Sequence, residues 1–370
     1  MGPLTYTYEE LLAHKENTKI PAEVIEKLRA DADEIIKKPT MVITSVKLVR
    51  PSGDIHDYIS IAPYWWPNPD TPDGLPYVRR DGYVNPEVKT GIGPGGVYSR
   101  VHTLALACFY IGDEGYSEYA NRQLYDWFIN PETKMNPNGK YAQGIPGICE
   151  GRGTGLISFG SAYSLFNGMG ILEHMGLLDE KINEGVKAWF VEFANWILTH
   201  EYGIAMDNGH DNHASWHDAN LLATAIYTNR PQLVKKICST AYDRRVKFLI
   251  KPDGSQPSEL SRTKAMGYSF YNLQAQLVIA NIAERLGYTD YWTVDEEREN
   301  CVLKSAVDFI YPYVCDPASF PYKELYPDKQ SNGMARSLLA VDRRFPTEGY
   351  AERAARFINP AEEWLLEPVL

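Results

Sequence analysis

The sequence predicts an all-α protein built from helical hairpins, arranged as a toroid or a solenoid. From Gly96 onward, helical stretches alternate with short turns that carry Gly or Pro. Strand-like alternation is scarce outside residues 40–61 and 246–250. Repeated helical hairpins without alternating β segments are typical of these two architectures. No internal sequence repeat identifies a particular solenoid family.

The individual helices are expected from the spacing of apolar residues. The first begins at Pro21 and extends over residues 21–37, with apolar positions at Val24, Ile25 and Leu28. Later helices are expected at residues 97–111, 116–129, 156–176, 180–199, 213–228, 231–250, 269–286, 296–313, 331–341 and 347–358.

Residues 50–96 differ from this pattern, because Pro, Gly, Asp and Asn are dense there and aromatic residues lie among them. A long irregular segment within a compact domain is usually functional or disordered, and the aromatic content argues against disorder.

Composition excludes some classes of partner. The chain has 370 residues, 44% hydrophobic and 23% charged, as in ordinary globular proteins. A net charge of -11 argues against a protein that coats nucleic acid or an anionic membrane, although a basic cleft can still take an anionic substrate. No apolar run is long enough to span a bilayer. Residues 1–5 lack a signal-peptide pattern, so we expect an exported protein to appear here in its mature form.

Aromatic residues are in excess, with 25 Tyr and 8 Trp. Flat rings cover the apolar faces of sugars, so the excess favours carbohydrate binding, although most of these rings are expected to fill the core. The five cysteines are widely spaced and form no CxxC pair, and we expect most of them to be buried free thiols.

The first candidate motif is Asp211–Asp218, which holds Asn212, His213, Trp216 and His217 within six residues. On a helix His213 and His217 share a face, and with His210 they have a spacing that fits zinc. No carboxylate or thiol stands in place as a fourth ligand, so we expect no metal. A capped helix N-terminus is the structural alternative. The pattern favours Asn212 and His213 as catalytic side chains.

The second motif lies in residues 258–272 and supplies Arg262, Tyr268 and Tyr271. An arginine can hold a carboxylate in bidentate fashion and can lower the pKa of a nearby tyrosine. Tyr268 is then a candidate to remove a carbon-bound proton. A core tyrosine beside a surface arginine is the structural alternative.

Two loops supply candidate substrate contacts. Gln143 and Arg152 lie in a glycine-rich stretch that lacks the Lys-Ser/Thr end of a phosphate loop, and a structural turn explains them equally well. Tyr64, Trp65 and Trp66 are suited either to stack on sugar rings or to fasten their own loop to the helical body. No serine-hydrolase, kinase or dinucleotide-binding signature occurs.

Several long motifs, in order, resemble the alginate lyase domain family. They cover residues 40–340 and are Tyr64–Pro69, Pro76–Gly82, Asn85–Glu87, Tyr141–Gln143, Gly151–Gly153, Asn212–His213 with Trp216, Arg262 to Tyr268, and Phe320–Lys323. The family is related to polysaccharide lyase family 5, and this sequence is more similar to the family 38 group of alginate and glucuronan lyases. The segment from Arg262 to Tyr268 is one residue shorter than family 5 leads us to expect.

The resemblance implies an incomplete α/α toroid of six or seven helical hairpins, and we expect one catalytic domain over residues 1–370. It implies β-elimination on an anionic polyuronate without a metal or other cofactor, in the periplasm or outside the cell. Tyr268, His213, Asn212 and Arg262 are the expected catalytic residues. The expected substrate contacts are Tyr64, Trp65, Trp66, Arg79, Arg80, Gln143, Arg152, Trp216, His217 and Tyr271.

The roles within this set follow from the chemistry of the substrate. Asn212 and Arg262, with His213 as a further candidate, are expected to neutralise the uronate carboxylate, because the C5 proton is otherwise not acidic enough to leave. In β-mannuronate the C5 hydrogen and the leaving oxygen lie on one side, and Tyr268 alone can serve as base and acid. In α-guluronate they lie on opposite sides, and His213 becomes the better base with Tyr268 as the acid.

Two other classes of function stay open at this point. A glycoside hydrolase needs a separated pair of carboxyl groups, for which Asp207, Asp211, Asp218 and Glu259 are available. A non-catalytic glycan-binding protein would use Trp65 and Trp66. Release of an unsaturated product separates a lyase from both.

Overall fold

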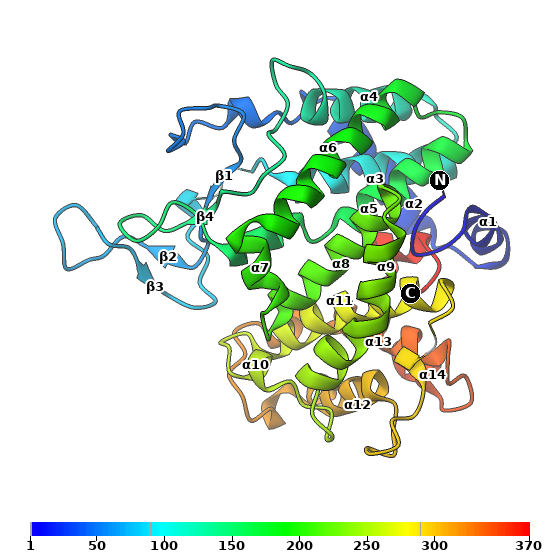
Figure 1. Cartoon of the computed structure of the whole chain (residues 1–370). Helices are drawn as coiled ribbons and strands as arrows, with labels where there is room; N and C mark the ends of the chain where they lie inside the picture. Colours follow the sequence, from blue (N-terminus) through cyan, green and yellow to red (C-terminus); the bar gives the residue numbers. More distant parts are fainter. Residues whose placement is uncertain (1, 89–90, 289) are drawn as a thin grey trace.

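The computed structural model describes residues 2–88, 91–288 and 290–370, and it confirms a mostly helical chain arranged as an incomplete α/α toroid (Figure 1). Five inner helices pack side by side in chain order: α3 (Pro94–Ile111), α5 (Ala162–His174), α8 (Asn212–Tyr227), α11 (Ala265–Arg285) and α13 (Ser331–Asp342). Outer helices cover them: α2 (Ala22–Ile36), α4 (Gly115–Phe128), α6 (Glu180–Thr199), α9 (Pro231–Ala241), α12 (Val302–Cys315) and α14 (Tyr350–Ala354).

The division into inner and outer helices follows from their sequences. Inner helices such as α8 and α11 are buried around most of their circumference, because small and apolar residues occupy nearly every face. The outer helix α9 instead buries one stripe, made by Ile237, Cys238 and Ala241, and exposes polar residues on its other side.

Several predicted boundaries need correction. Residues 156–176 divide into a 3₁₀ segment, η3 (Gly153–Phe159), and α5, and the helix expected from residue 296 begins at Val302. Residues 246–250 do not form a strand. They span the end of a π-helical segment, η4 (Tyr242–Lys247), which continues α9, and the residues just after it. Val246 and Ile250 are both buried in the core.

Three helices were not predicted: α1 (Tyr8–Asn17), α7 (Glu201–Asp207) and the single turn α10 (Pro257–Leu260). A capping box was the available signal for α1, since Thr7 and Glu10 bond each other's backbone amides. For α7 the signal was weaker, because its N-cap is His200.

The irregular segment before α3 carries short paired strands. β1 (Ile59–Ile61) pairs in parallel with β4 (Tyr141–Gly144), which ties this segment to the loop after α4. β2 (Trp65–Trp66) pairs with β3 (Val78–Arg79) in antiparallel fashion. We call residues 62–82 the flap, since they project from the helical body at the left of Figure 1.

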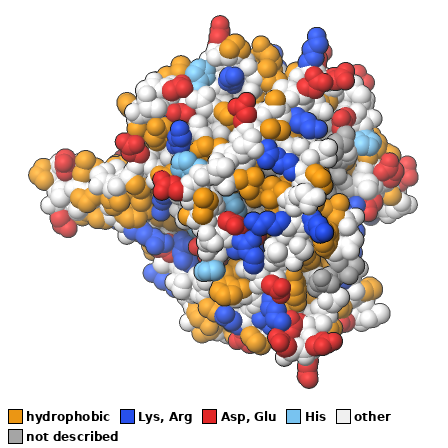
Figure 2. Space-filling view, viewed as in Figure 1, with side chains coloured by type: hydrophobic (Ala, Val, Ile, Leu, Met, Phe, Trp, Pro, Cys, Tyr) orange, Lys and Arg blue, Asp and Glu red, His pale blue; other side chains and the backbone are white. Residues whose placement is uncertain are grey.

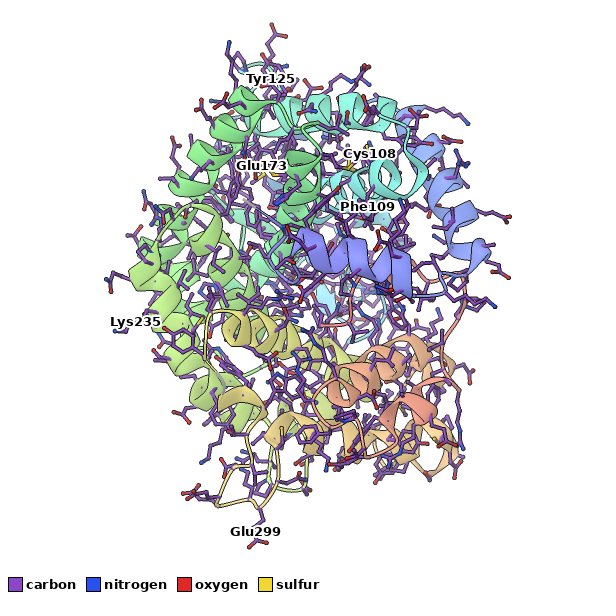
Figure 3. The ribbon with its side chains drawn as sticks, turned by 90° about the vertical axis from the view of Figure 1, so that its right-hand side faces the viewer. Cys108, Phe109, Tyr125, Glu173, Lys235 and Glu299 are labelled. Atoms are coloured by element: carbon purple, nitrogen blue, oxygen red, sulfur yellow. The ribbon has the colours of Figure 1, made fainter. Side chains whose placement is uncertain are left out.

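In the described part of the chain the C-terminal segment, and not a helix, bridges α13 and α3, since Arg344, just after α13, donates to the backbone of Leu370 at 2.6 Å. This segment includes η8 (Glu363–Leu366), and Glu367 accepts hydrogen bonds from Tyr6 at 2.5 Å and from His102 of α3 at 3.0 Å. α1 lies on the same side of the molecule, toward the viewer in Figure 3.

The cysteines differ in their burial. Cys108, Cys238 and Cys301 are buried free thiols, as predicted, whereas Cys149 is half-buried and Cys315 is exposed. Among the described helices, none combines the length and apolar character that crossing a bilayer requires.

Candidate active site

A cavity of about 940 Å³ lies between the flap and the N-terminal ends of α8 and α11. Its lining comes from chain segments far apart in sequence: the flap, the loop around β4 and η3, the start of α8, α10 and the start of α11. All four predicted catalytic residues line it, namely Asn212, His213, Arg262 and Tyr268. The volume is in the range of about 300–1,000 Å³ that is typical of small-molecule pockets.

The start of α8 presents His213 in a defined orientation. Asp211 is the N-cap residue and accepts a hydrogen bond from the backbone amide of His213 at 3.0 Å. The other carboxylate oxygen of Asp211 lies 3.2 Å from Nδ1 of His213. Burial opposes ionisation of Asp211, but the hydrogen bond from His213 lowers the pKa of this carboxyl below its usual range. With Nδ1 bonded to Asp211, Nε2 is left to act as a base.

Glu259 fixes the neighbouring Asn212. Its two carboxylate oxygens accept hydrogen bonds from the backbone amide of Asn212 at 2.7 Å and from its side-chain amide at 2.6 Å. Glu259 is 1% exposed, and burial raises its pKa to about 7. From the sequence, Glu259 was expected only as one of four carboxyl groups open to a hydrolase. The sequence signal that could have placed Glu259 at the site was its position three residues before Arg262.

Tyr268 lies within a network that joins α11 to the flap. Its phenol accepts a hydrogen bond from Arg262 at 2.9 Å and donates one to the phenol of Tyr64 at 2.7 Å. The guanidinium carbon of Arg262 lies 3.9 Å from the centre of the Tyr268 ring. Lys264 donates weakly to Tyr64 at 3.5 Å.

Arg262 is itself paired with the flap. Asp81 accepts from Nε and Nη2 of Arg262 at 3.2 and 2.7 Å, and it also accepts from the backbone amide and hydroxyl of Thr263. Although burial opposes its ionisation, these bonds hold the pKa of Asp81 well below its usual value. The flap approaches this closely at Gly82, where φ is 82° and a side chain would collide with Thr263 and Leu325.

The expectation that an arginine lowers the pKa of Tyr268 needs correction. Burial and the hydrogen bond to Tyr64 raise the pKa of Tyr268 above its usual value, and these effects outweigh the opposing effect of Arg262. A raised pKa favours the protonated form of the Tyr268 phenol, which suits it to act as an acid.

Arg152, like Lys264, is a cavity cation without an ion pair in the part of the chain that the structure describes. Its Nη2 donates to Gln143 at 2.7 Å, its Nε is buried without a hydrogen-bond partner, and no carboxylate lies within 4.0 Å among the described residues. Gln143 has a φ of 49°, which is unusual for a residue with a side chain. Figure 2 shows further Lys and Arg side chains gathered where the flap meets the helical body.

The cavity brings together most of the predicted substrate contacts. Its lining includes the following residues of that set: Tyr64, Trp65, Arg79, Gln143, Arg152 and Tyr271. Arg79 also donates to Asp81 at 2.7 Å.

Four predicted contacts lie outside the lining. Trp66 donates to the backbone of Tyr83 and packs under Arg80, so this pair fastens the flap. Trp216 is buried behind the cavity, with its ring centre 5.0 Å from that of Tyr271. His217 is buried beside Asp207 and Asp218, and burial lowers its pKa.

The three histidines with zinc-like spacing do not come together as a metal site. His210 and His213 line the cavity. His217 lies instead beside Asp207 and Asp218, and one carboxylate or imidazole atom from each of these three residues lies within 4.8 Å of the others. These two carboxylates already pair with arginines of η4: Arg244 with Asp207 at 2.6 Å, and Arg245 with Asp218 at 2.8 Å.

Comparisons with known proteins agree with the fold and with the order of the motifs. A family model described as alginate lyase matches residues 42–320. An alginate lyase of Pseudomonas syringae pv. tomato is 30% identical over 143 residues, which is 36% of this chain and 34% of the relative. One of Pseudomonas fluorescens is 29% identical over 43% of this chain and 40% of the relative. The matches thus span well under half the length of these relatives.

Solved structures match over nearly the whole chain. The crystal structure of an alginate lyase from Bacteroides ovatus has a TM-score of 0.92 and 33% identity, with 98% of both chains covered. A variant of alginate lyase A1-III complexed with a tetrasaccharide has a TM-score of 0.57 and 17% identity, covering 95% of this chain and 97% of the other. At that identity the second match supports the fold alone.

Proposed function

Because the chain belongs to the alginate lyase family, we propose that it is a polysaccharide lyase that cleaves a 1,4-linked polyuronate, with alginate as the first candidate substrate and glucuronan as the second. The proposal treats residues 1–370 as one catalytic domain and places the enzyme in the periplasm or outside the cell, where such a polymer is met. The observation that carries it is the joint lining of one cavity by an Asp-His pair, a buried Glu-Asn pair, an arginine without an ion pair and a tyrosine bonded to Arg262.

Elimination requires that the carboxylate of the uronate be neutralised, since the electrons of the breaking C5–H bond delocalise into it. Asn212 retains one amide N–H beyond the bond to Glu259, and Arg152 carries a charge without an ion pair among the described residues. We assign neutralisation to these two. Arg262 is already paired with Asp81, so its role is to hold and stabilise Tyr268.

The proton transfers are assigned to His213 and Tyr268. His213, oriented by Asp211, removes the C5 proton, and a double bond forms between C4 and C5 as the C4–O bond breaks. Tyr268 then donates its proton to the leaving oxygen. This pair suits α-guluronate, in which the hydrogen and the leaving oxygen lie on opposite sides.

For β-mannuronate a second route starts once Tyr268 has lost its phenolic proton to solvent. The phenolate then removes the C5 proton and returns it to the leaving oxygen as the C4–O bond breaks. Arg262, 3.9 Å from the ring centre, stabilises the transient phenolate on this route. Neither route passes a proton or an electron pair through a metal.

Fewer carboxyl groups line the cavity than a hydrolase could draw on in the sequence. Of the four carboxyl groups expected for a hydrolase, only Asp211 and Glu259 line the cavity, and they are bonded to His213 and Asn212. The rival glycan-binding role retains Trp65 in the cavity but not Trp66.

The test is ultraviolet absorbance during incubation with polymannuronate, polyguluronate and glucuronan, with a chelator in half the samples. We expect a chelator-insensitive rise with at least one polymer, because elimination forms a conjugated double bond. New reducing ends without absorbance would indicate a hydrolase, and binding without either signal would indicate a glycan-binding protein.

A further inference from the structure

A second cavity, of about 460 Å³, lies inside the ring beyond the candidate active site. Parts of α3, α5, α11, α13 and the C-terminal segment line it. Gly267 and Tyr271 line both cavities, so the two meet at this turn of α11. Tyr163 lines the second cavity and Tyr64 lines the first, on either side of this junction.

The lining of this second cavity suits a sugar ring. Ser99, Asn167, Gln274 and Asn332 offer hydroxyl and amide groups, and Trp364 offers an aromatic surface. Oδ1 of Asn332 is buried without a hydrogen-bond partner. Amides and hydroxyls that bond ring hydroxyl groups, beside an aromatic side chain that covers an apolar sugar face, are the groups that a pyranose requires. The volume is also that of a small-molecule pocket.

One charged side chain in this cavity, Arg336, is available to bind a carboxylate. Arg336 has no carboxylate within 4.0 Å among residues 2–88, 91–288 and 290–370. The acids beside it are already bonded, since Glu367 accepts from His102 at 3.0 Å and Glu363 accepts from Thr103 at 3.0 Å. A carboxylate on the bound sugar would give the guanidinium of Arg336 its ion pair.

We propose that the second cavity binds the terminal uronate ring of the polymer, with the carboxylate of that ring on Arg336. The inference rests on the proposed polyuronate lyase function and extends it to a chain-end site next to Tyr271. An oligomer that reaches both cavities then gains contacts that the shortest cleavable oligomer lacks. Catalytic efficiency is therefore expected to rise at the length that reaches the second cavity.

The first test compares kcat/KM for oligouronates from dimer to hexamer in the wild type and in Arg336→Gln. We expect the variant to lose about tenfold on the longer oligomers, as loss of a hydrogen bond to a charged group predicts, with the shortest cleaved oligomer unaffected. Arg356→Gln removes the same charge from an exposed site outside both cavities and is expected to leave the profile unchanged. An equal loss at every length, or no loss at any, would overturn the proposal.

A second variant covers the case in which Arg336→Gln does not fold. Gln274→Glu keeps the size of a residue that lines only the second cavity and places a negative charge there. Repulsion of the uronate carboxylate predicts the same length-dependent loss. A length profile equal to that of the wild type would count against the cavity as a uronate site.

Calorimetric titration with the monosaccharide mannuronate tests the cavity without catalysis. We expect binding to weaken by about tenfold in Arg336→Gln and to persist in Tyr268→Phe. Absence of saturable binding, or binding that Arg336→Gln leaves unchanged, overturns the proposal even if the protein is an active lyase. Absence of unsaturated product from every polymer would instead overturn the proposed function, and the titration would still decide the cavity.

Discussion

Replacing Glu259 by Gln tests whether this buried carboxyl holds Asn212 in its working orientation. The wild-type carboxylate accepts two hydrogen bonds from Asn212, at 2.7 and 2.6 Å. A glutamine offers one oxygen and turns an NH₂ group toward the other donor, so one hydrogen bond to a charged group is lost. Such a bond contributes about 1.5–3 kcal/mol. If that loss falls on the transition state, kcat drops by roughly 10- to 100-fold.

The same substitution changes the pH dependence of stability. The pKa of Glu259 is raised from 4.5 to about 7 in the folded protein, so the folded state holds this proton more tightly than the unfolded state. The stabilisation is fully present below pH 4.5 and is lost as the pH rises through about 7. The difference corresponds to about 3 kcal/mol of unfolding free energy.

Urea unfolding at pH 4.5 and pH 8 measures this effect, with the wild type compared with Glu259→Gln and with Glu352→Gln, an exposed glutamate on α14. We expect the wild type, but not Glu259→Gln, to lose about 3 kcal/mol beyond the changes common to all three proteins. The kcat/KM profile of the wild type is expected to carry a limb near pH 7 that Glu259→Gln lacks. A Glu259→Gln variant with wild-type kcat and wild-type pH dependence would refute the positioning role.

Three further substitutions test separate parts of the site. Tyr268→Phe is expected to reduce kcat by at least about a thousandfold with little change in polymer binding, whereas Tyr125→Phe, at the outer edge of the molecule (Figure 3), should leave both unchanged. Wild-type turnover by Tyr268→Phe would remove the assignment. Arg152→Gln is expected to lower kcat/KM by at least about tenfold, with part of the loss in kcat, because negative charge builds on the carboxylate in the transition state. An unchanged kcat/KM in steady-state kinetics would argue against Arg152 as a carboxylate ligand. Arg245→Met leaves the carboxylate of Asp218 buried without its partner, so urea unfolding should show a loss of about 3–5 kcal/mol, and an unchanged midpoint would contradict this account.

The helical class and the order of the motifs were predictable because their signals are local. Apolar spacing along α6 predicted residues 180–199, and the helix has those bounds. Asp211 before Asn212 and His213 is a cap signal that needs no distant contact. The residue types suited to elimination, His213, Arg262 and Tyr268, were selected for their chemistry before any contact between them was known.

The partners of these residues were not predictable, because they come from distant segments. Glu259 bonds Asn212 across 47 residues, Asp81 bonds Arg262 across 181, and Tyr64 bonds Tyr268 across 204. No local pattern encodes which of several acids or tyrosines will lie within about 3 Å of a given side chain. The flap and the ring of helices determine these pairs.

The sequence by itself determined that the chain is helical and which family it belongs to, and it nominated the side chains proposed to carry the chemistry. Only the tertiary structure decided the partners, the burial and the pKa values of those side chains. It showed that Arg262 is paired with Asp81, that Tyr268 bonds Tyr64 of the flap, and that Trp216 and His217 are buried outside the cavity lining. The physical reason is that a pKa depends on burial and on charges within a few ångströms, and both are set when distant segments pack together.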